Sequence, residues 1–181
     1  MSLIKLPAMQ PGQLPRSLTM LVLAILLTAC GFHLRGEAIM PFKTLYIEAA
    51  NPGSPLIGEL RRLLEANNVR LTSKADQADV VLDIESELPE KQILTLGGSG
   101  RVSEFQLRYR VSLRAYDNQQ REWLPADELL LNRDFTYDDA QILAKESEEA
   151  LLYQGMRSDM AQQIMRRLSH AKPQPLNPQQ K

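Results

Sequence analysis

The sequence predicts an α+β domain of two layers, in which two helices pack on one face of a β-sheet. In three segments the apolar and polar residues alternate with a period of two, which is typical of half-buried strands. In two others the apolar residues recur at spacings of three and four, which is typical of amphipathic helices. These segments lie within residues 43–170, a stretch long enough to bury the core of one domain.

The first elements are a strand, a helix and a second, short strand. Leu45 and Ile47 share one face of a strand predicted over 43–49. Ser54 suits an N-cap, and Pro55 suits the first helical position, where its missing N–H is not needed. The helix is predicted over 55–67, and the short strand over 69–72.

Residues 79–137 read as an antiparallel meander of three strands. The first is predicted over 79–88, continuing past Pro89 through 93–96, and the others over 104–116 and 129–137. The side chains expected to face the core are Val80, Leu82, Ile84, Leu88, Phe105, Leu107, Tyr109, Val111 and Leu113. The acids expected on the opposite face are Asp83, Glu85 and Glu87.

The longest element is predicted to be a helix, capped by Asp138 or Asp139 and ending near Ser169. An apolar stripe runs along it, formed by Tyr153, Met156, Met160, Ile164 and Leu168. Residues 171–181, rich in proline and glutamine, are predicted to be a disordered tail.

Residues 1–29 are predicted to be a cleaved signal peptide. The apolar run 18–29 would form a helix of about 18 Å, too short for a hydrocarbon core of roughly 30 Å. Leu27-Thr28-Ala29-Cys30 resembles the lipobox of bacterial lipoproteins, which implies S-diacylglycerol and an N-acyl chain on Cys30 and no other cofactor. Gly31 in place of the inner-membrane signal Asp implies the outer membrane, and 30–42 would be the lipidated tether. The alternative is that Cys30 is an ordinary small buried side chain.

Composition excludes several classes of function. The chain has 21 Lys and Arg and 22 Asp and Glu; without Lys5 and Arg16 of the signal, 19 bases face 22 acids, a charge of −3. A nucleic-acid-binding domain would need a basic excess, so no nucleic-acid partner is expected. The mature chain offers one cysteine and two remote histidines, which predicts neither a metal site nor a catalytic centre.

The unusual feature of the sequence is a group of arginines on and next to one predicted strand. Arg108, Arg110 and Arg114 project from the polar face of one predicted strand, and Arg101 precedes it. Such guanidinium groups bind phosphates or sugar acids. The alternative is that the three strand arginines pair with Asp83, Glu85 and Glu87 across the sheet. Lys145 is the other basic candidate, with an i, i+4 pair to Glu149 as its alternative role.

Cys30-Gly31-Phe32-His33-Leu34-Arg35 resembles the start of the mature lipopolysaccharide-assembly lipoproteins of the LptE family. The resemblance continues through the Gly-x-x-x-Glu-aromatic-Gln run at 100–106 and through Ala144-Lys145. It implies two helices on a four-stranded mixed sheet, with no enzymatic activity. It also implies a one-to-one plug inside the outer-membrane β-barrel LptD, which assists assembly of that barrel and insertion of lipopolysaccharide into the outer leaflet.

The same resemblance implies that Lys145 contacts lipopolysaccharide. The family's second contact is a basic residue in the hairpin loop, a position held here by Gly98, and Arg101 is near enough to replace it. We therefore expect a lipid-anchored outer-membrane protein on the periplasmic side and in the barrel lumen, with Lys145, Arg101, Arg108, Arg110 and Arg114 as candidate lipopolysaccharide ligands. The rival hypotheses are a free periplasmic lipoprotein that binds lipid or envelope polymer in a pocket between helices and sheet, and an envelope hydrolase.

Overall fold

The computed structural model describes residues 40–119 and 121–175. The predicted signal peptide, Cys30 and the tether up to residue 39 lie outside these ranges. The elements are β1 (Thr44–Ala49), α2 (Pro55–Ala66), β2 (Arg70–Leu71), η1 (Ala75–Gln77), β3 (Val80–Leu96), β4 (Val102–Tyr116), β5 (Arg121–Thr136), η2 (Asp139–Gln141), α3 (Ile142–His170) and β6 (Gln174–Pro175).

The strands form one mixed sheet in the order β2-β1-β3-β4-β5-β6. β1 runs parallel to β2 and β3, and the other neighbours are antiparallel. The expected α+β fold with a mixed sheet is confirmed, but the sheet has six strands rather than four. The difference comes from its margins, where β2 and β6 have two residues each. β6 lies within the predicted tail and pairs with Arg121 and Glu122, while residues 176–181 are not described.

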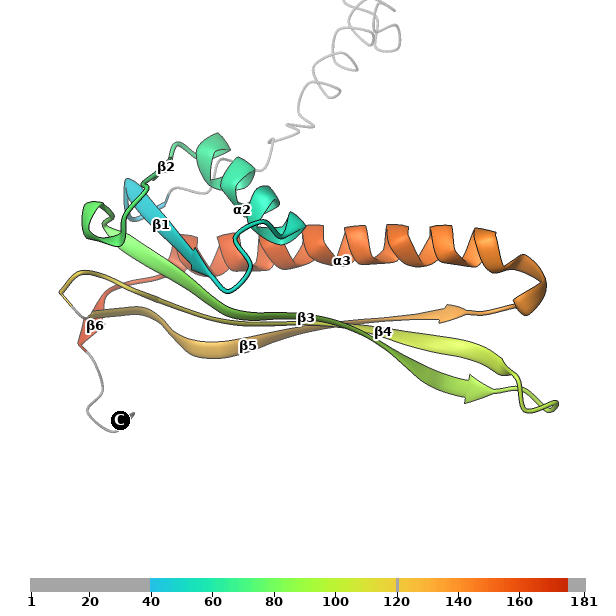
Figure 1. The fold of residues 1–181 in the computed structure, drawn as a ribbon. Coiled ribbons are helices and arrows are strands. Elements are labelled where there is room, and N and C mark those ends of the chain that lie inside the picture. Colours follow the sequence, from blue (N-terminus) through green and yellow to red (C-terminus); the bar gives the residue numbers. More distant parts are fainter. Residues whose placement is uncertain (1–39, 120, 176–181) are drawn as a thin grey trace, which may run out of the picture. The chain divides into compact units, whose positions relative to one another are not determined.

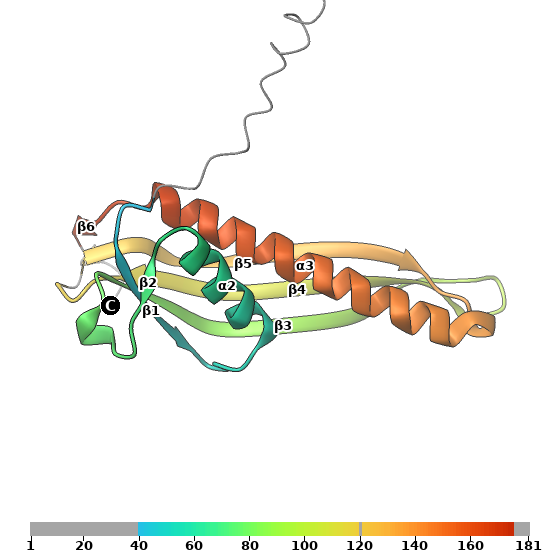
Figure 2. The same ribbon diagram turned by 90° about the horizontal axis from the view of Figure 1, so that it is seen from above.

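Both α2 and α3 cover the same face of the sheet, and no helix of the described residues lies on the opposite face (Figures 1 and 2). The core lies between these layers. Its fully buried side chains include Leu45, Leu56, Leu60, Leu82, Leu107, Tyr109, Leu113, Met156, Met160 and Ile164. The buried positions of β4 are those that its alternation predicted, because every second residue of this strand faces the helices.

Ser54 caps α2 as predicted, but the cap predicted for the last helix was wrong: α3 begins at Ile142 after Gln141, whose side chain makes no capping hydrogen bond. The Ser54 hydroxyl accepts a hydrogen bond of 3.2 Å from the backbone N–H of Ile57 at the start of α2. Asp138 accepts one from the N–H of Ala140, which stabilises η2, the short turn that precedes α3. Along α3 all the buried residues lie from Met156 onward, so only its second half packs into the core.

β3 departs from the predicted alternation. A β-bulge between Ile84 and Ser86 shifts the register against β4, and the residues that follow change faces. Glu87 pairs in register with Val111 on the helix-covered face, and Leu88 pairs with Arg110 on the open face, 46% exposed. The expected faces of Glu87 and Leu88 were therefore wrong, since the extra residue inverts a period of two.

β5 begins at Arg121, eight residues before the predicted start at 129. The first half of this strand was missed because Pro125 and the acids after it interrupt the alternation. Proline is tolerated here because β6 covers only the first two residues of β5, which leaves an open edge at Pro125. Pro89 is tolerated in β3 for the same reason, since β1 ends its pairing at Ile84.

Candidate functional site

One end of the domain brings together the β3–β4 hairpin, η2 and the start of α3 (Figure 2); we call it the distal end. Arg101 lies in the hairpin loop, 76% exposed at its side chain, with its Nη1 3.9 Å from the Asp139 carboxylate of η2. At that distance and exposure the pair is weak. The Arg101 guanidinium is therefore open to an anionic ligand.

Lys145 lies at the same end, in the first turn of α3. Its Nζ donates to the Glu148 carboxylate at 2.8 Å and to the Thr136 hydroxyl of β5 at 3.2 Å. Glu148 takes the place of the expected partner Glu149, which is bound by another lysine. The Lys145 side chain is 15% exposed, so its charge is held at a fixed place beside the end of β5.

That other lysine is Lys91 of β3, which the sequence did not single out. Its Nζ lies 2.5 Å from Glu149 of α3 and 4.2 Å from the centroid of the Phe105 ring. The Phe135 and Tyr137 rings lie at 5.6 and 5.7 Å from the same nitrogen. The ion pair thus ties the first half of α3 to the sheet, and the cation–π attraction holds the Lys91 ammonium against the aromatic rings beside it. No sequence pattern marks Lys91, because the bulge in β3 decides which face it occupies.

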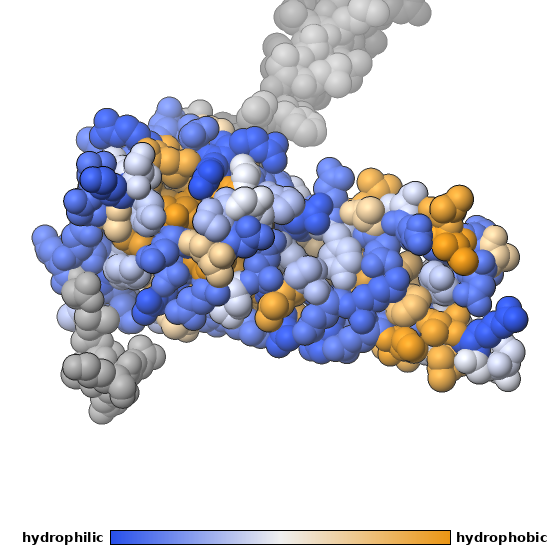
Figure 3. Space-filling view, viewed as in Figure 1, coloured by the Kyte–Doolittle hydropathy of each residue, from blue (hydrophilic) through white to orange (hydrophobic). Residues whose placement is uncertain are grey.

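Large apolar side chains remain exposed around the distal end. Those of β3 are Ile93, Leu94 and Leu96, and those of α3 are Ile142, Leu143 and Leu151. Leu143 and Leu151 are 79% and 68% exposed. Figure 3 shows apolar patches gathered at the end where α3 begins. Such a concentration marks a binding surface more often than chance exposure.

The open face of the sheet carries the three arginines of β4. Arg114 Nε donates to Asp83 at 2.9 Å and lies 3.5 Å from Glu85. The hydrogen bond to Asp83 raises the pKa of the Arg114 guanidinium above its usual value. Arg114 therefore has the structural role that was its alternative, as a partner of the acids of β3.

Arg110 and Arg108 differ from each other. Arg110 pairs with Glu90 at 2.6 Å, an acid outside the expected group of Asp83, Glu85 and Glu87. The Glu87 carboxylate lies on the other face, where it accepts a hydrogen bond from the Tyr109 hydroxyl. Burial and that hydrogen bond raise the pKa of Tyr109 above its usual value. Arg108 has no hydrogen bond or ion pair with any residue that the structure describes.

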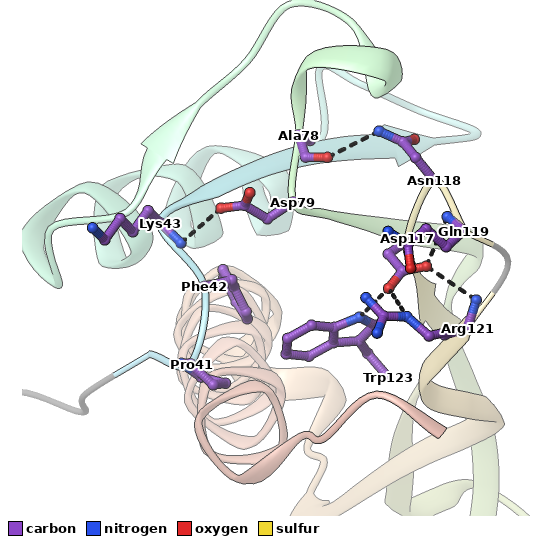
Figure 4. A pocket seen from close by; sticks show the side chains of 10 residues that line it. All are labelled: Pro41, Phe42, Lys43, Ala78, Asp79, Asp117, Asn118, Gln119, Arg121 and Trp123. Atoms are coloured by element: carbon purple, nitrogen blue, oxygen red, sulfur yellow. Dashed lines mark hydrogen bonds and ion pairs between the residues drawn. The ribbon is translucent and has the colours of Figure 1, made fainter. Parts of the chain in front are cut away.

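A polar pocket lies at the opposite end, where β1 begins (Figure 4). The buried Asp117 accepts hydrogen bonds from the backbone N–H groups of Gln119 and Arg121, from Arg121 Nε and from Trp123 Nε1. Burial favours the neutral form of Asp117, but these hydrogen bonds outweigh it and lower its pKa. This carboxylate has no free acceptor, and it serves to fix the β4–β5 turn and the Trp123 ring.

The described part of the chain contains no cluster of three or more His, Cys, Asp and Glu that would hold a metal ion. Within the same residues, no helix is long and apolar enough to cross a membrane. Cys30 lies outside them.

Comparison with known proteins decides the family. The family model described as "LptE: Lipopolysaccharide-assembly" matches residues 42–168, most of the chain. The chain belongs to the LptE family. The LPS-assembly lipoprotein LptE of Photorhabdus laumondii is 31% identical over 164 residues, which cover 84% of this chain and 85% of that protein.

Solved structures agree with this assignment. The solution structure of an uncharacterized lipoprotein B from Nitrosomonas europaea is 38% identical, with a TM-score of 0.67 over 77% of this chain and 90% of that one. The crystal structure of a minor lipoprotein from Acinetobacter baumannii is 27% identical, with a TM-score of 0.62 over 77% and 99%. This chain thus belongs to a family of non-enzymatic lipoproteins of lipopolysaccharide assembly.

Proposed function

We propose that this LptE-family protein is anchored in the outer membrane by acyl chains on Cys30. On the periplasmic side it plugs the LptD β-barrel, and it presents its distal end to lipopolysaccharide during insertion into the outer leaflet. The observation that carries the proposal is the meeting of Arg101, Lys145 and exposed apolar side chains at this end.

Lipopolysaccharide combines phosphates with acyl chains, and the distal end matches both. The Arg101 guanidinium offers charged donors to a phosphate, and the Lys145 ammonium can do so when the phosphate takes the place of the Glu148 carboxylate. Leu94, Leu96 and Leu143 offer apolar surface within the same end of the domain. A cation that is already fixed, as Lys145 is, loses little entropy on binding.

The other face of the sheet suits the lumen of a barrel. Its charges alternate in sign and its acids and bases largely pair, as at Arg114 with Asp83 and at Arg110 with Glu90. Such a face can lie next to water or next to the polar inner wall of a barrel without leaving buried charges unpaired. The rival function, a free carrier with a pocket between helices and sheet, finds less support, because side chains such as Leu60, Tyr109 and Met160 fill that interface and are almost fully buried.

The lipopolysaccharide contact is tested by charge reversal in the purified protein. Lys145→Glu and Arg101→Glu should each weaken binding to lipopolysaccharide about tenfold or more, since each removes a charge-assisted hydrogen bond worth about 1.5–3 kcal/mol. Arg70→Glu in β2, far from the distal end, is the matched control. Unchanged binding in both distal variants, with folding intact by circular dichroism, would contradict the proposed contact.

The plug and the anchor are tested in membranes. After mild solubilisation the native protein should be recovered with an equimolar barrel protein, and its mature N-terminus should be an acylated Cys30 by mass spectrometry. Recovery without a barrel would refute the plug. An unmodified Cys30 would refute the anchor and return this residue to an ordinary buried role.

A further inference from the structure

The open face of the sheet has a middle region in which apolar and cationic side chains lie side by side. Strand register places Leu88 of β3 and Leu130 of β5 on either side of Arg110, and Glu90 and Asn132 on either side of Arg108. Directly paired residues in antiparallel strands share a face. Leu88 and Leu130 are 46% and 41% exposed there, which leaves two leucines uncovered on a face that no helix of the described residues covers.

Most of the acids around this region already have partners; the exception is Glu128 of β5, which is in register with Ser112 and has no side-chain partner among the described residues. Asp83 and Glu85 bind Arg114, Glu90 binds Arg110, and Asp134 accepts from Gln106. Arg108 is the cation of β4 on this face that no described acid neutralises. Its charge is therefore available to an acid from outside the chain.

The guanidinium of Arg108 is held in place as well as unpaired. Its Nε is enclosed and has no hydrogen-bond acceptor among the described residues, and the Nε of Arg110 is enclosed in the same way. An enclosed N–H without an acceptor costs about 1–3 kcal/mol of folding free energy. No hydrogen bond within the described residues offsets this cost for Arg108 Nε and Arg110 Nε. The terminal nitrogens of Arg108 are not among the enclosed atoms, and they reach the surface without a partner.

We propose that Leu88, Arg108 and Leu130 form a docking surface for the barrel protein, with Arg108 bound to a carboxylate of that partner. The inference rests on the proposed function and assigns a face to it. Arginine flanked by apolar side chains is typical of the centre of a protein interface. A phosphate-rich ligand would need several open cations, whereas Arg110 and Arg114 are already neutralised. Charge complementarity thus favours a single carboxylate on a protein surface over lipopolysaccharide.

The test uses the full-length acylated protein extracted from membranes by mild solubilisation. Arg108→Glu should lower the recovered barrel protein at least tenfold, because it places two carboxylates against each other, and Arg108→Lys should retain part of it. Arg70→Glu is the control on β2 and should leave recovery unchanged. Binding of lipopolysaccharide by the purified Arg108→Glu protein should equal that of the natural sequence.

Each result of these experiments supports or overturns the docking surface. Full recovery of the barrel with Arg108→Glu overturns the docking surface while leaving the plug standing. Loss of lipopolysaccharide binding with normal recovery of the barrel would assign the face to lipid instead. Absence of the barrel even with the natural sequence refutes the proposed function, and this inference with it.

A second measurement guards against misfolding of the charge-reversal variant. A photo-reactive phenylalanine analogue at Leu130, in a chain otherwise unchanged, should give an adduct with the mass of this protein plus the barrel protein. The same analogue at an α2 position, Arg62, serves as a comparison from the helix-covered side. No adduct from Leu130 in a complex that contains the barrel would overturn the proposal.

Discussion

Removal of the Lys91 ammonium should loosen the first half of α3 without unfolding the second. In Lys91→Met the side chain keeps most of its apolar length but loses the ion pair with Glu149 and the attraction to the Phe105 ring. The two side chains are 33% and 23% exposed, so the pair is partly solvated and is worth about 0.5–1 kcal/mol. The cation–π contact adds about 0.5–1.5 kcal/mol. The expected loss is therefore about 1–2.5 kcal/mol, or roughly 3–8 °C in Tm.

Urea unfolding and amide hydrogen exchange measure this loss in two ways. Exchange should accelerate over 145–152, where α3 has few buried contacts, and stay slow over 156–168, where the helix packs into the core. A cycle with Glu149→Gln should give a coupling free energy of about 0.5 kcal/mol or more. Arg133→Met, which breaks a pair to Asp159 that is 48% exposed on both sides, is the control and should cost less than about 0.5 kcal/mol. Uniform acceleration along all of α3, or no coupling, would refute the idea that Lys91 holds only this half.

Three further predictions concern the turns. Asp117→Asn should lower the free energy of unfolding by about 1.5–3 kcal/mol at pH 7, because the amide turns an NH₂ group toward donors such as Trp123 Nε1. Since the pKa of Asp117 is lowered on folding, the natural protein should lose this advantage as pH falls below about 4. Urea titrations in which the difference between the two proteins stays constant down to about pH 2 would contradict this role of Asp117. Gly98→Arg should strengthen lipopolysaccharide binding with unchanged Tm, because an added Cβ meets no atom within 4 Å. Gly100→Ala, at φ +76°, should instead lower stability by about 1–2 kcal/mol in thermal unfolding, and equal Tm values for the two variants would refute this distinction.

The sequence predicts those parts of the fold that repeat a local pattern. The stripe from Met156 to Leu168 and the alternation of β4 identify core faces, because a helix period or a strand period continues unbroken there. The cap at Ser54 follows from side-chain chemistry that acts within three residues. These features need no knowledge of distant contacts.

The features that the sequence does not predict depend on how distant strands pair with each other. The bulge after Ile84 moves Glu87 away from the arginines and turns Lys91 toward the aromatic rings, and no residue type marks its position. The partners of the arginines follow from it, so the roles of Arg108, Arg110 and Arg114 could be separated only by the register of β3 against β4. Sequence reasoning located the basic surface and could not tell which of its members is unpaired.

The parallel pairing of β1 with β3 has a mechanical consequence for a tethered protein. Any tension carried by the chain ahead of Thr44 enters the sheet along β1, whose residues Leu45–Ala49 are in register with Val80–Ile84. If the load leaves through the far end of β3, the two strands are pulled past each other in shear, so their hydrogen bonds bear the force together rather than one after another. Separation of β1 from β3 then requires all of these hydrogen bonds to break in one step, so its rate under force should be low. This makes β1 a mechanically resistant attachment point for a membrane tether.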